Sequence, residues 1–409
     1  MTTNKNHNSP NVPNSTDKGN VIRNVPALRF PEFEGEWKKE QLGDTADFSK
    51  GAGISKEQLS EKGEPCILYG ELYTKYKSEV IYDIISKTDI DSTKLVRSQA
   101  NDVIIPSSGE TAEDIATARC VLKNNILLGG DLNIIRLHNH SGSFMSYQLN
   151  GKRKYDIAKV AQGVSVVHLY AEHLKGVNTY NPCMEEQEKI ARLLSLLDER
   201  IATQNKIIED LKKLKSAIIH RCYSSQTKMI PLSELLKQCS DRNRSGSDLQ
   251  VLSVSNKYGF IAQSDQFEDR EVASDDTSNY KVVKKGMFAY NPARINVGSI
   301  ALYEMDGNGI VSPMYVCFTT KSELLPSYLK YYFASQTFKH EMYKRLEGSV
   351  RLCLTFEELC NIEIHLPSIE QQKNISKYIS KIENNLSLVD SIFSKYQQQR
   401  RYLLSQMFI

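Results

Sequence analysis

A long internal repeat constrains the fold of this chain more than any other feature. Aligned with itself at an offset of 185 residues, the chain has nine identities in the 33 positions from 163 to 195, against about two expected by chance. Pro182 matches Pro367, for example, and Gln187 matches Gln372. Solenoid repeats are only about 20 to 50 residues long, so this period indicates a duplicated domain.

Each copy of the repeat ends in a long run that predicts an α-helix. Pro182 and Pro367 precede the two runs, and Glu185 and Glu370 stand in the first turn, as is typical of helix N-termini. Apolar residues then recur at steps of four and three, which is the pattern of a coiled-coil seam. The predicted seam residues are Leu194, Leu197, Ile201, Ile208, Leu211 and Ile218 in the first run and Ile379, Ile382, Leu386, Val389, Phe393, Tyr396 and Leu403 in the second.

Two positions of this seam carry a basic residue instead, Lys215 and Arg400, and they too are 185 residues apart. One interpretation is that each long side chain extends along the helix and keeps its charge in water near the helix end. The other is that the two residues fix the register of the helices or contact a partner protein.

The regions between the long helices contain short β-prone runs bounded by turn residues, such as Val103–Ile105 and Met287–Tyr290. A shorter helix is expected around Phe144–Gly151 and another around Tyr328–Leu346. The predicted fold class is therefore α+β: two mixed α/β domains separated by two long helices, with a pseudo-two-fold internal duplication. Two equivalent helices in one chain most simply pair as an antiparallel coiled coil, at most ~57 Å long at 1.5 Å per residue.

The domain boundaries follow from this pattern. Residues 1–24 are rich in Asn, Ser, Thr and Pro, and we expect a disordered N-terminal tail. The first domain is predicted at 25–181, the first long helix at 182–224, the second domain at 225–366 and the second long helix at 367–409.

Composition excludes several classes of protein. The net charge of +3 is too balanced for a basic nucleic-acid tail, although local basic faces are possible. No apolar run approaches the ~20 residues that span a bilayer, and the first 24 residues do not form a signal peptide, so we expect a cytoplasmic protein. The eight cysteines form no C-x-x-C pair and no zinc-ligand spacing. No phosphate-binding or dinucleotide-binding glycine motif is present, and no catalytic or metal residues are predicted.

Several segments together resemble the specificity subunits of type I restriction–modification systems. The resemblance begins at Leu28–Phe33 and Trp37, continues through Gly163–Ile201 and Gly348–Gln372, and includes the loop Tyr290–Gly298. It covers nearly the whole chain from about residue 25.

The second copy departs from the first in two places. Gln371 stands where the first copy has Glu186, and no aspartate matches Asp198. Both departures lie on the second long helix, and they leave the family assignment intact.

The resemblance implies a non-catalytic DNA-recognition subunit with two target-recognition domains, each reading one half of a split, asymmetric site in double-stranded DNA. The paired helices would hold the domains apart and dock two modification (methyltransferase) subunits, and restriction (translocase/endonuclease) subunits would complete the assembly. S-adenosylmethionine, ATP and magnesium would be bound by the partner subunits, and no cofactor by this chain. A ~57 Å rod would span at most about 17 base pairs at 3.4 Å each.

Residues that could read DNA are basic, aromatic, amide or hydroxyl side chains in loops. In the first domain the candidates are Lys50, Tyr69, Tyr73, Lys75, Tyr76, Ser107, Ser108 and Thr111. In the second domain they are Arg242, Arg244, Asn256, Lys257, Tyr258, Asn291, Arg294, Asn296, Lys344, Arg345 and Arg351. The alternatives are a solvated strand edge for 69–77, a structural turn for 291–296 and a solvated helix face for 344–351.

Two other functions fit the same residues. The chain could be the specificity portion of a restriction–methylation fusion whose catalytic part lies elsewhere. It could also be a structural coiled-coil adaptor with no DNA role.

Overall fold

The computed structural model describes residues 24–163, 166–224, 228–244, 249–263, 276–348 and 352–409. Of the predicted N-terminal tail only Asn24 lies within these ranges. The chain divides into two compact units, and each is described by itself. Unit 1 comprises residues up to Thr203 together with Ser394–Ile409, and unit 2 comprises Gln204–Phe393. Each long helix therefore contributes one part to each unit.

Unit 1 contains two five-stranded sheets of mixed direction. The first has the order β2 (Ala46–Lys50), β12 (Leu132–Leu137), β8 (Asp102–Pro106), β10 (Arg119–Val121) and β5 (Val80–Ile81). The second has the order β3 (Leu59–Ser60), β6 (Ser86–Thr88), β4 (Glu64–Ile67), β11 (Leu127–Leu128) and β7 (Val96–Arg97). Two small ladders join β1 (Lys38–Gln41) to β14 (Asn178–Asn181) and β9 (Ser108–Gly109) to β13 (Val167–His168).

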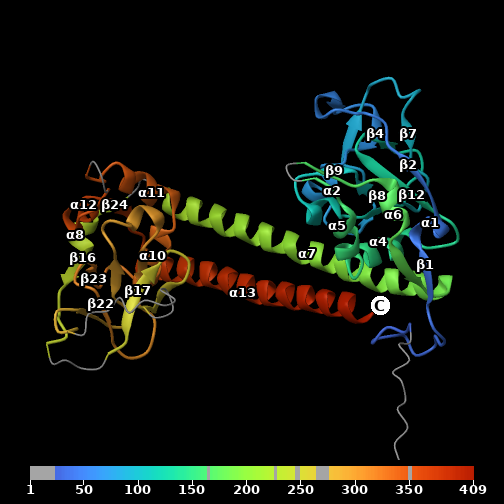
Figure 1. The fold of residues 1–409 in the computed structure, drawn as a ribbon. Helices are drawn as coiled ribbons and strands as arrows, with labels where there is room; N and C mark the ends of the chain where they lie inside the picture. The colour runs from blue at the N-terminus through green and yellow to red at the C-terminus, as the bar shows by residue number, and fades with distance from the viewer. Residues whose placement is uncertain (1–23, 164–165, 225–227, 245–248, 264–275, 349–351) are drawn as a thin grey trace, which may run out of the picture. The chain divides into compact units, whose positions relative to one another are not determined.

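Short helices connect and cover the strands of unit 1. They are α1 (Leu42–Thr45), η1 (Lys56–Gln58), α2 (Glu71–Thr74), α3 (Ala112–Ile115), α4 (Gly142–Asn150), α5 (Lys154–Val160) and α6 (Ala171–Lys175). Helix α4 contributes Phe144 and Tyr147 to a buried cluster that also contains Leu194 and Leu197 of the first long helix. This helix is therefore the layer between the first sheet and the long helices of the unit (Figure 1).

Unit 2 repeats the core of this topology with four strands in each sheet instead of five, and its described residues contain no counterpart of β5 or β3. Its first sheet has the order β16 (Leu236–Cys239), β23 (Val316–Thr320), β20 (Phe288–Tyr290) and β21 (Ile300–Leu302). Its second has the order β18 (Gly259–Ala262), β17 (Val251–Ser255), β22 (Gly309–Val311) and β19 (Lys281–Val283), and β15 (Met229–Pro231) pairs with β24 (Glu363–His365). The helical elements are α8 (Leu232–Leu235), η2 (Ile295–Val297), α10 (Pro326–Phe333), α11 (Gln336–Tyr343) and α12 (Phe356–Cys360). The predicted duplication and the α+β class are therefore confirmed.

The two long helices are α7 (Met184–Tyr223) and α13 (Ile369–Gln406). Neither contains proline or glycine, and both carry glutamate in the first turn, which favours an uninterrupted helix. All thirteen predicted seam residues are buried or partly buried, whereas the flanking positions Leu196, Lys213 and Leu388 are exposed. The heptad pattern therefore identified the face that each helix buries.

The seam residues Lys215 and Arg400 are both used in ion pairs between the helices. In unit 1, Arg400 Nε donates to Asp198 Oδ1 at 2.6 Å, and in unit 2, Lys215 Nζ donates to Glu383 Oε1 at 2.6 Å. The step from Asp198 to Lys215 along α7 equals the step from Arg400 back to Glu383 along α13, so the helices are antiparallel. Of the two interpretations of these basic residues, the structure favours register over simple extension into water.

The C-terminal part of each long helix completes the core of a unit. In unit 1, Phe408 packs against Trp37 and Phe144 with ring centroids 6.5 and 5.3 Å apart. In unit 2, Tyr223 packs on Tyr328 at 4.7 Å. Phe408 follows α13, whose proline-led start lies in the second copy of the repeat, and Tyr223 ends the helix of the first copy. Each copy therefore donates its helix end to the core of the other, as expected of an antiparallel pair.

A buried glutamine fixes the start of each long helix. Gln187 donates to Pro182 O at 2.8 Å and accepts from the N–H of Ser141, the N-cap of α4, at 3.0 Å. Its repeat partner Gln372 donates to Pro367 O at 3.0 Å and accepts from the N–H of Leu325, the N-cap of α10, at 2.9 Å. The glutamine amide therefore satisfies backbone groups at two helix ends at once, which explains why it is repeated.

Candidate nucleic-acid interface

Three loops in each unit follow equivalent strands and contain most of the predicted DNA-reading residues. In unit 1 they follow β2, whose last residue is Lys50, and β4 and β8, and the latter two contain the segment 69–77 and the segment 107–111. In unit 2 they follow β16, β17 and β20, and they contain Arg242 with Arg244, the segment 256–258 and the segment 291–296. The sequence predictions made separately for the two domains therefore fall on the same places in the fold.

Strand direction brings the loops of unit 1 together. Strand β12 is antiparallel to both β2 and β8, so the C-terminal ends of β2 and β8 lie on the same side. Gly51 N donates to Leu132 O at 3.0 Å, and Ser107 N donates to Asp131 O at 2.7 Å. Gly129 N donates to Ile67 O, at the end of β4, at 2.9 Å. The segment 129–132 therefore contacts the C-terminal ends of all three strands.

A cavity of about 940 Å³ opens in unit 1 between the loops after β2 and β4 and the turn 129–131. Tyr69, Lys75, Lys56 and Asp131 are among its lining residues. Tyr69 and Lys56 are exposed. The Lys75 ammonium donates to Glu71 at 2.6 Å and to Ser86 at 2.7 Å, so two of its hydrogen bonds are made within the protein. The cavity therefore offers an aromatic face, cations and a carboxylate together, a combination that suits nucleic-acid bases and phosphates.

Two of the predicted contacts in unit 1 are buried. Tyr76 is 6% exposed, and its hydroxyl accepts from Ile85 N at 3.2 Å. Burial raises the pKa of Tyr76 to about 12. Ser107 is also buried, at the end of β8, so we leave both residues out of the proposed interface. Lys50 and Thr111 are exposed, Ser108 is half-buried, and the Thr111 hydroxyl caps α3 by accepting from Asp114 N at 3.1 Å.

Tyr73 lies at the acidic side of this surface. Burial, together with smaller contributions from the nearby Tyr69, Asp114, Glu110 and Asp131, raises the pKa of Tyr73 to about 12. The phenol therefore stays protonated at neutral pH and can donate a hydrogen bond. The carboxylates around it are acceptors, and cytosine N4 is the base donor that such groups read in the major groove.

In unit 2 the loop 291–298 is held by hydrogen bonds within the loop itself. Asn291 Oδ1 accepts from Ala293 N at 3.0 Å, and Gly298 adopts a left-handed conformation (φ 94°) that closes η2. Arg294 and Val297 are exposed. The amide of Asn291 therefore shapes the turn, and Arg294 is presented to solvent.

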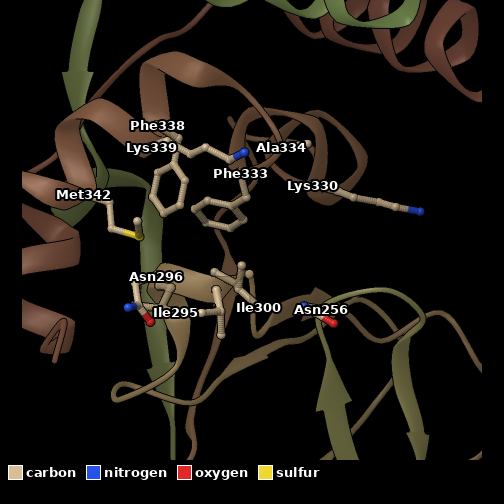
Figure 2. A pocket seen from close by; sticks show the side chains of 12 residues that line it. Asn256, Ile295, Asn296, Ile300, Lys330, Phe333, Ala334, Phe338, Lys339 and Met342 are labelled. Carbon is tan, nitrogen blue, oxygen red and sulfur yellow. The ribbon is translucent and has the colours of Figure 1, made fainter. Parts of the chain in front are cut away.

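A second cavity, of about 410 Å³, lies between this loop and helices α10 and α11. Figure 2 shows Phe333, Phe338 and Met342 on its helical side and Asn256, Ile295, Asn296 and Ile300 on the other, with Lys330 and Lys339 also among the labelled side chains. The structure therefore brings the predicted Asn256 and Asn296 to one cavity. In unit 1 the loop after β8 carries α3 instead, and Ile115 of α3 is buried in the core of that unit.

The remaining basic candidates of unit 2 differ in availability. Arg244 is exposed, and Lys257 is exposed with its ammonium 4.7 Å from the centre of the Tyr258 ring. Arg242 Nη1 donates to Asn279 at 2.7 Å. Lys344 and Arg345 both pair with Glu341 at 2.7 and 2.6 Å. Arg351 lies outside the described residues.

Sequence reasoning missed several residues that line the two cavities, among them Lys56, Asp131, Lys330 and Lys339. For Asp131 a signal existed, because the preceding Gly129-Gly130 marks a turn directly before a β-prone run. Lys330 and Lys339 lie on helices that the sequence did not place beside the loop. Within the described ranges, no three histidine, cysteine, aspartate or glutamate residues are arranged to hold a metal ion. None of the helices searched there is long and apolar enough to cross a membrane.

Comparisons with known proteins place this fold in a family. A model of the type I restriction modification DNA specificity domain matches residues 34–213 and 241–392. The type I restriction enzyme MjaVIII specificity subunit of Methanocaldococcus jannaschii is 25% identical over 406 residues, covering 90% of each chain. Among solved structures, the S subunit of a type I restriction–modification system from M. genitalium superposes with a TM-score of 0.63 at 17% identity, over 94% of this chain and 99% of that one. A structure described as the basis of complex assembly and conformational transition of the type I R-M system gives a TM-score of 0.51 at 15% identity, over 91% and 97%. The two matches to one family model cover most of the chain, and the chain belongs to the type I restriction–modification DNA specificity family.

Proposed function

We propose that this chain, as the specificity subunit of a type I restriction–modification complex, reads a bipartite, asymmetric DNA site, with one half-site read by the loops of each unit. Catalysis then belongs to the partner subunits, which supply S-adenosylmethionine, ATP and magnesium. The site of action is the cytoplasm, where the DNA is.

The observation that carries this proposal is that equivalent loops differ in chemistry. After β8, unit 1 presents Ser108, Glu110 and Thr111, whereas after β20, unit 2 presents Arg294 and Asn296. Arginine suits guanine and asparagine suits adenine, while carboxylates accept from cytosine. Recognition of two different half-sites requires equivalent loops of the fold to carry different base-reading side chains in the two units.

The paired helices are proposed to set the spacer between the half-sites. Helix α7 has 40 residues and α13 has 38, both without a break. At 1.5 Å per residue a helix of this length extends about 60 Å. A rigid connection of fixed length would fix the number of unread base pairs.

The outer faces of the long helices are proposed to dock the modification subunits. Leu214 on α7 is 49% exposed, and Tyr378 and Leu388 on α13 are 63% and 60% exposed. All three lie outside the seam. Apolar side chains left exposed on a charged helix are suited to a protein partner, since an interface core is richer in apolar and aromatic groups than the surface around it.

The decisive experiment is methylation-sensitive sequencing of DNA from cells that carry this gene with its modification partner. The expected result is a split motif with adenine methylation and a spacer of fixed length. A continuous or palindromic motif would contradict the assignment of one different half-site to each unit. A coiled-coil adaptor without a DNA role would give no motif and no salt-dependent DNA binding.

The spacer can be tested separately. Inserting four residues, about one turn, after Asn205 in α7 and again at the facing position of α13 should lengthen the spacer and leave both half-sites unchanged. Altered half-sites with an unchanged spacer would overturn the proposed role of the helices. Exchanging the two exposed residues Glu209 and Asp210 for each other is the matched control and should change neither.

A further inference from the structure

The DNA-reading segment 69–77 of unit 1 has two faces with different environments. Its outer face, including Tyr69, Thr74 and Lys75, lines the 940 Å³ cavity. Its inner face packs on the sheet, where Leu72 and Tyr76 are buried. The segment has one short helix, α2, and pairs with no strand within the described residues, so its position depends on side chains.

A single arginine holds the inner face. Arg119 on β10 is 7% exposed, and its guanidinium donates to two main-chain carbonyls, Leu72 O at 3.2 Å through Nε and Tyr76 O at 3.1 Å through Nη2. These carbonyls are separated by four residues, which is the length of the helical turn. A planar guanidinium with fixed donors can fix both ends of that turn at once, whereas an ammonium can reach only one reliably.

Arg119 is in turn connected to the long helices. Its Nη1 lies 3.9 Å from Glu79 Oε1, and Glu79, which is 5% exposed, forms an ion pair with Arg400 of α13 through its other oxygen. Although burial alone would raise the pKa of Glu79, Arg400 and Arg119 hold it below its ordinary value, so the carboxylate is charged. Arg400 completes the chain of contacts by donating to Asp198 of α7.

We propose that Arg119 is a positioning residue for DNA reading by unit 1. It holds the segment 69–77 in place through its hydrogen bonds to Leu72 and Tyr76, and Glu79 and Arg400 hold Arg119. The inference rests on the proposed role of this segment in reading one half-site. Arg119 itself does not contact DNA, since it lies beneath the segment and is buried. Half-site discrimination by unit 1 then depends on Arg400, a residue from the second copy of the repeat.

The fold explains why only unit 1 needs this device. In unit 2 the equivalent connection, Ser255–Gly259, is the turn of a β-hairpin, and β17 and β18 pair directly on both sides of it. Ladder hydrogen bonds therefore fix its shape. In unit 1, eighteen residues separate β4 from its antiparallel neighbour β6, and β5 pairs in the other sheet, so the corresponding connection lacks that support.

The test compares Arg119→Lys with Arg97→Lys in the complete complex with the modification subunits. Both are arginine-to-lysine changes in unit 1, and both retain a cation beside a glutamate. Arg97, however, pairs with Glu64 at the surface, and its hydrogen bonds go to Glu64, Ser92 and Asn125 and not to the segment. DNA binding is measured on libraries in which either half-site carries single-base changes. Arg119→Lys should lower discrimination at the unit 1 half-site by about tenfold and leave the other half-site unchanged, because reading groups must be held to within about 0.5 Å. Arg97→Lys should change neither.

Hydrogen–deuterium exchange adds an independent readout. Amides of residues 71–76 should exchange faster in Arg119→Lys, with the remainder of unit 1 unaffected. If the variant does not assemble, Glu79→Gln replaces it, since it releases Arg119 from its anchor without changing side-chain size, and a smaller loss at the same half-site is expected. Equal loss at both half-sites, or lowered stability with full discrimination, would overturn the positioning role.

A further variant separates this inference from the proposed function. Tyr69→Ala with Lys77→Ala removes two exposed side chains of the segment and leaves Arg119 in place. If this double variant changes the unit 1 half-site and Arg119→Lys does not, only the positioning role fails. If the double variant reads DNA normally, the segment 69–77 does not read DNA. The proposed function then fails for this segment, and the positioning role of Arg119 fails with it.

Discussion

The ion pairs between the helices are images of each other in the two copies of the repeat, yet they differ in burial. Asp198 and Glu383 are 185 residues apart, as are Lys215 and Arg400, and each acid also accepts from a tyrosine: Tyr147 at 2.7 Å or Tyr331 at 2.9 Å. In unit 1 the side chains of Asp198 and Arg400 are 9% and 23% exposed, while in unit 2 those of Glu383 and Lys215 are 32% and 28% exposed. The same arrangement is therefore internal in one unit and near the surface in the other.

This difference also concerns charge. In unit 1, burial and the neighbouring carboxylate of Glu79 raise the pKa of Asp198, and Arg400 has to neutralise both acids. In unit 2, Lys215 has one carboxylate to pair with, Glu383. Removal of one member of a buried ionic group leaves an uncompensated charge, whereas water replaces a partner at a surface pair. The place of each ion pair in the repeat therefore sets the register of the two helices, whereas the burial of the pair decides how much its loss destabilises the unit.

The largest effect is expected at Arg400. Arg400→Met removes the cation paired with Asp198 and leaves Glu79 with only the more distant Arg119, so it should destabilise unit 1 by about 3–5 kcal/mol. Lys215→Met, the equivalent change in unit 2, should cost only about 0.2–1 kcal/mol. Urea unfolding followed by tryptophan fluorescence measures this, because Trp37 is the only tryptophan of the chain and lies in unit 1 beside Phe144 and Phe408. Circular dichroism, which reports the helices and strands of both units, follows the unfolding of unit 2 in the Lys215→Met variant together with that of unit 1. Similar losses of unfolding free energy in the two variants would contradict the role given to burial.

The helix ends sharpen the comparison further. Tyr223 and Phe408 are repeat equivalents, but only Tyr223 has a hydroxyl, which donates to Tyr328 O at 2.7 Å inside the core. Tyr223→Phe removes that donor from a buried carbonyl and should cost about 1–3 kcal/mol. Phe408→Tyr is the reverse change in unit 1, where it inserts a hydroxyl between Trp37 and Phe144. Each variant should destabilise its own unit; a stabilised Tyr223→Phe would mean that the hydroxyl is not used.

Much of this architecture could be predicted from the sequence because it is encoded in local periodicity. The heptad steps identified the seam of both helices, and β-prone runs such as Val103–Ile105 lie within observed strands. One predicted helix, Tyr328–Leu346, is two helices instead. Helix α10 ends at Phe333, and Ser335 caps α11 by accepting from Phe338 N at 3.0 Å, so the chain turns at Ala334.

The rest could not be predicted because it depends on residues far apart in the chain. Glu79 meets Arg400 across 321 positions, and no local pattern marks that pairing. The absence of an aspartate matching Asp198 was read as a departure, yet Glu383 stands at that position and makes the equivalent ion pair. Tyr76 was grouped with Tyr69 and Tyr73 by composition, and only the packing of α2 shows which ring is buried.

The recognition loops give a comparison of function. Arg294 is exposed in unit 2, and no arginine lies at 107–111 in the loop after β8 of unit 1. Arg294→Ala should weaken specific binding by about 1–3 kcal/mol if the guanidinium grips a guanine, and should relax one base of the unit 2 half-site only. Competition binding of the assembled complex against single-base variants of both half-sites checks this. Arg221→Ala, an exposed arginine at the end of α7, is the matched control. Full affinity in Arg294→Ala would exclude a base contact.

The smallest effect is expected at Lys257, and it distinguishes a phosphate contact from a base contact. Lys257 is exposed at the hairpin tip, with its ammonium over the Tyr258 ring. If it neutralises one phosphate, Lys257→Ala should weaken binding to all sequences alike and reduce the slope of log affinity against log salt by about 1. Arg294→Ala should instead change the sequence preference at that base. Salt titrations of both variants on cognate and mutated sites compare the two effects. If Lys257→Ala also altered sequence preference, Lys257 would contact a base and not only a phosphate.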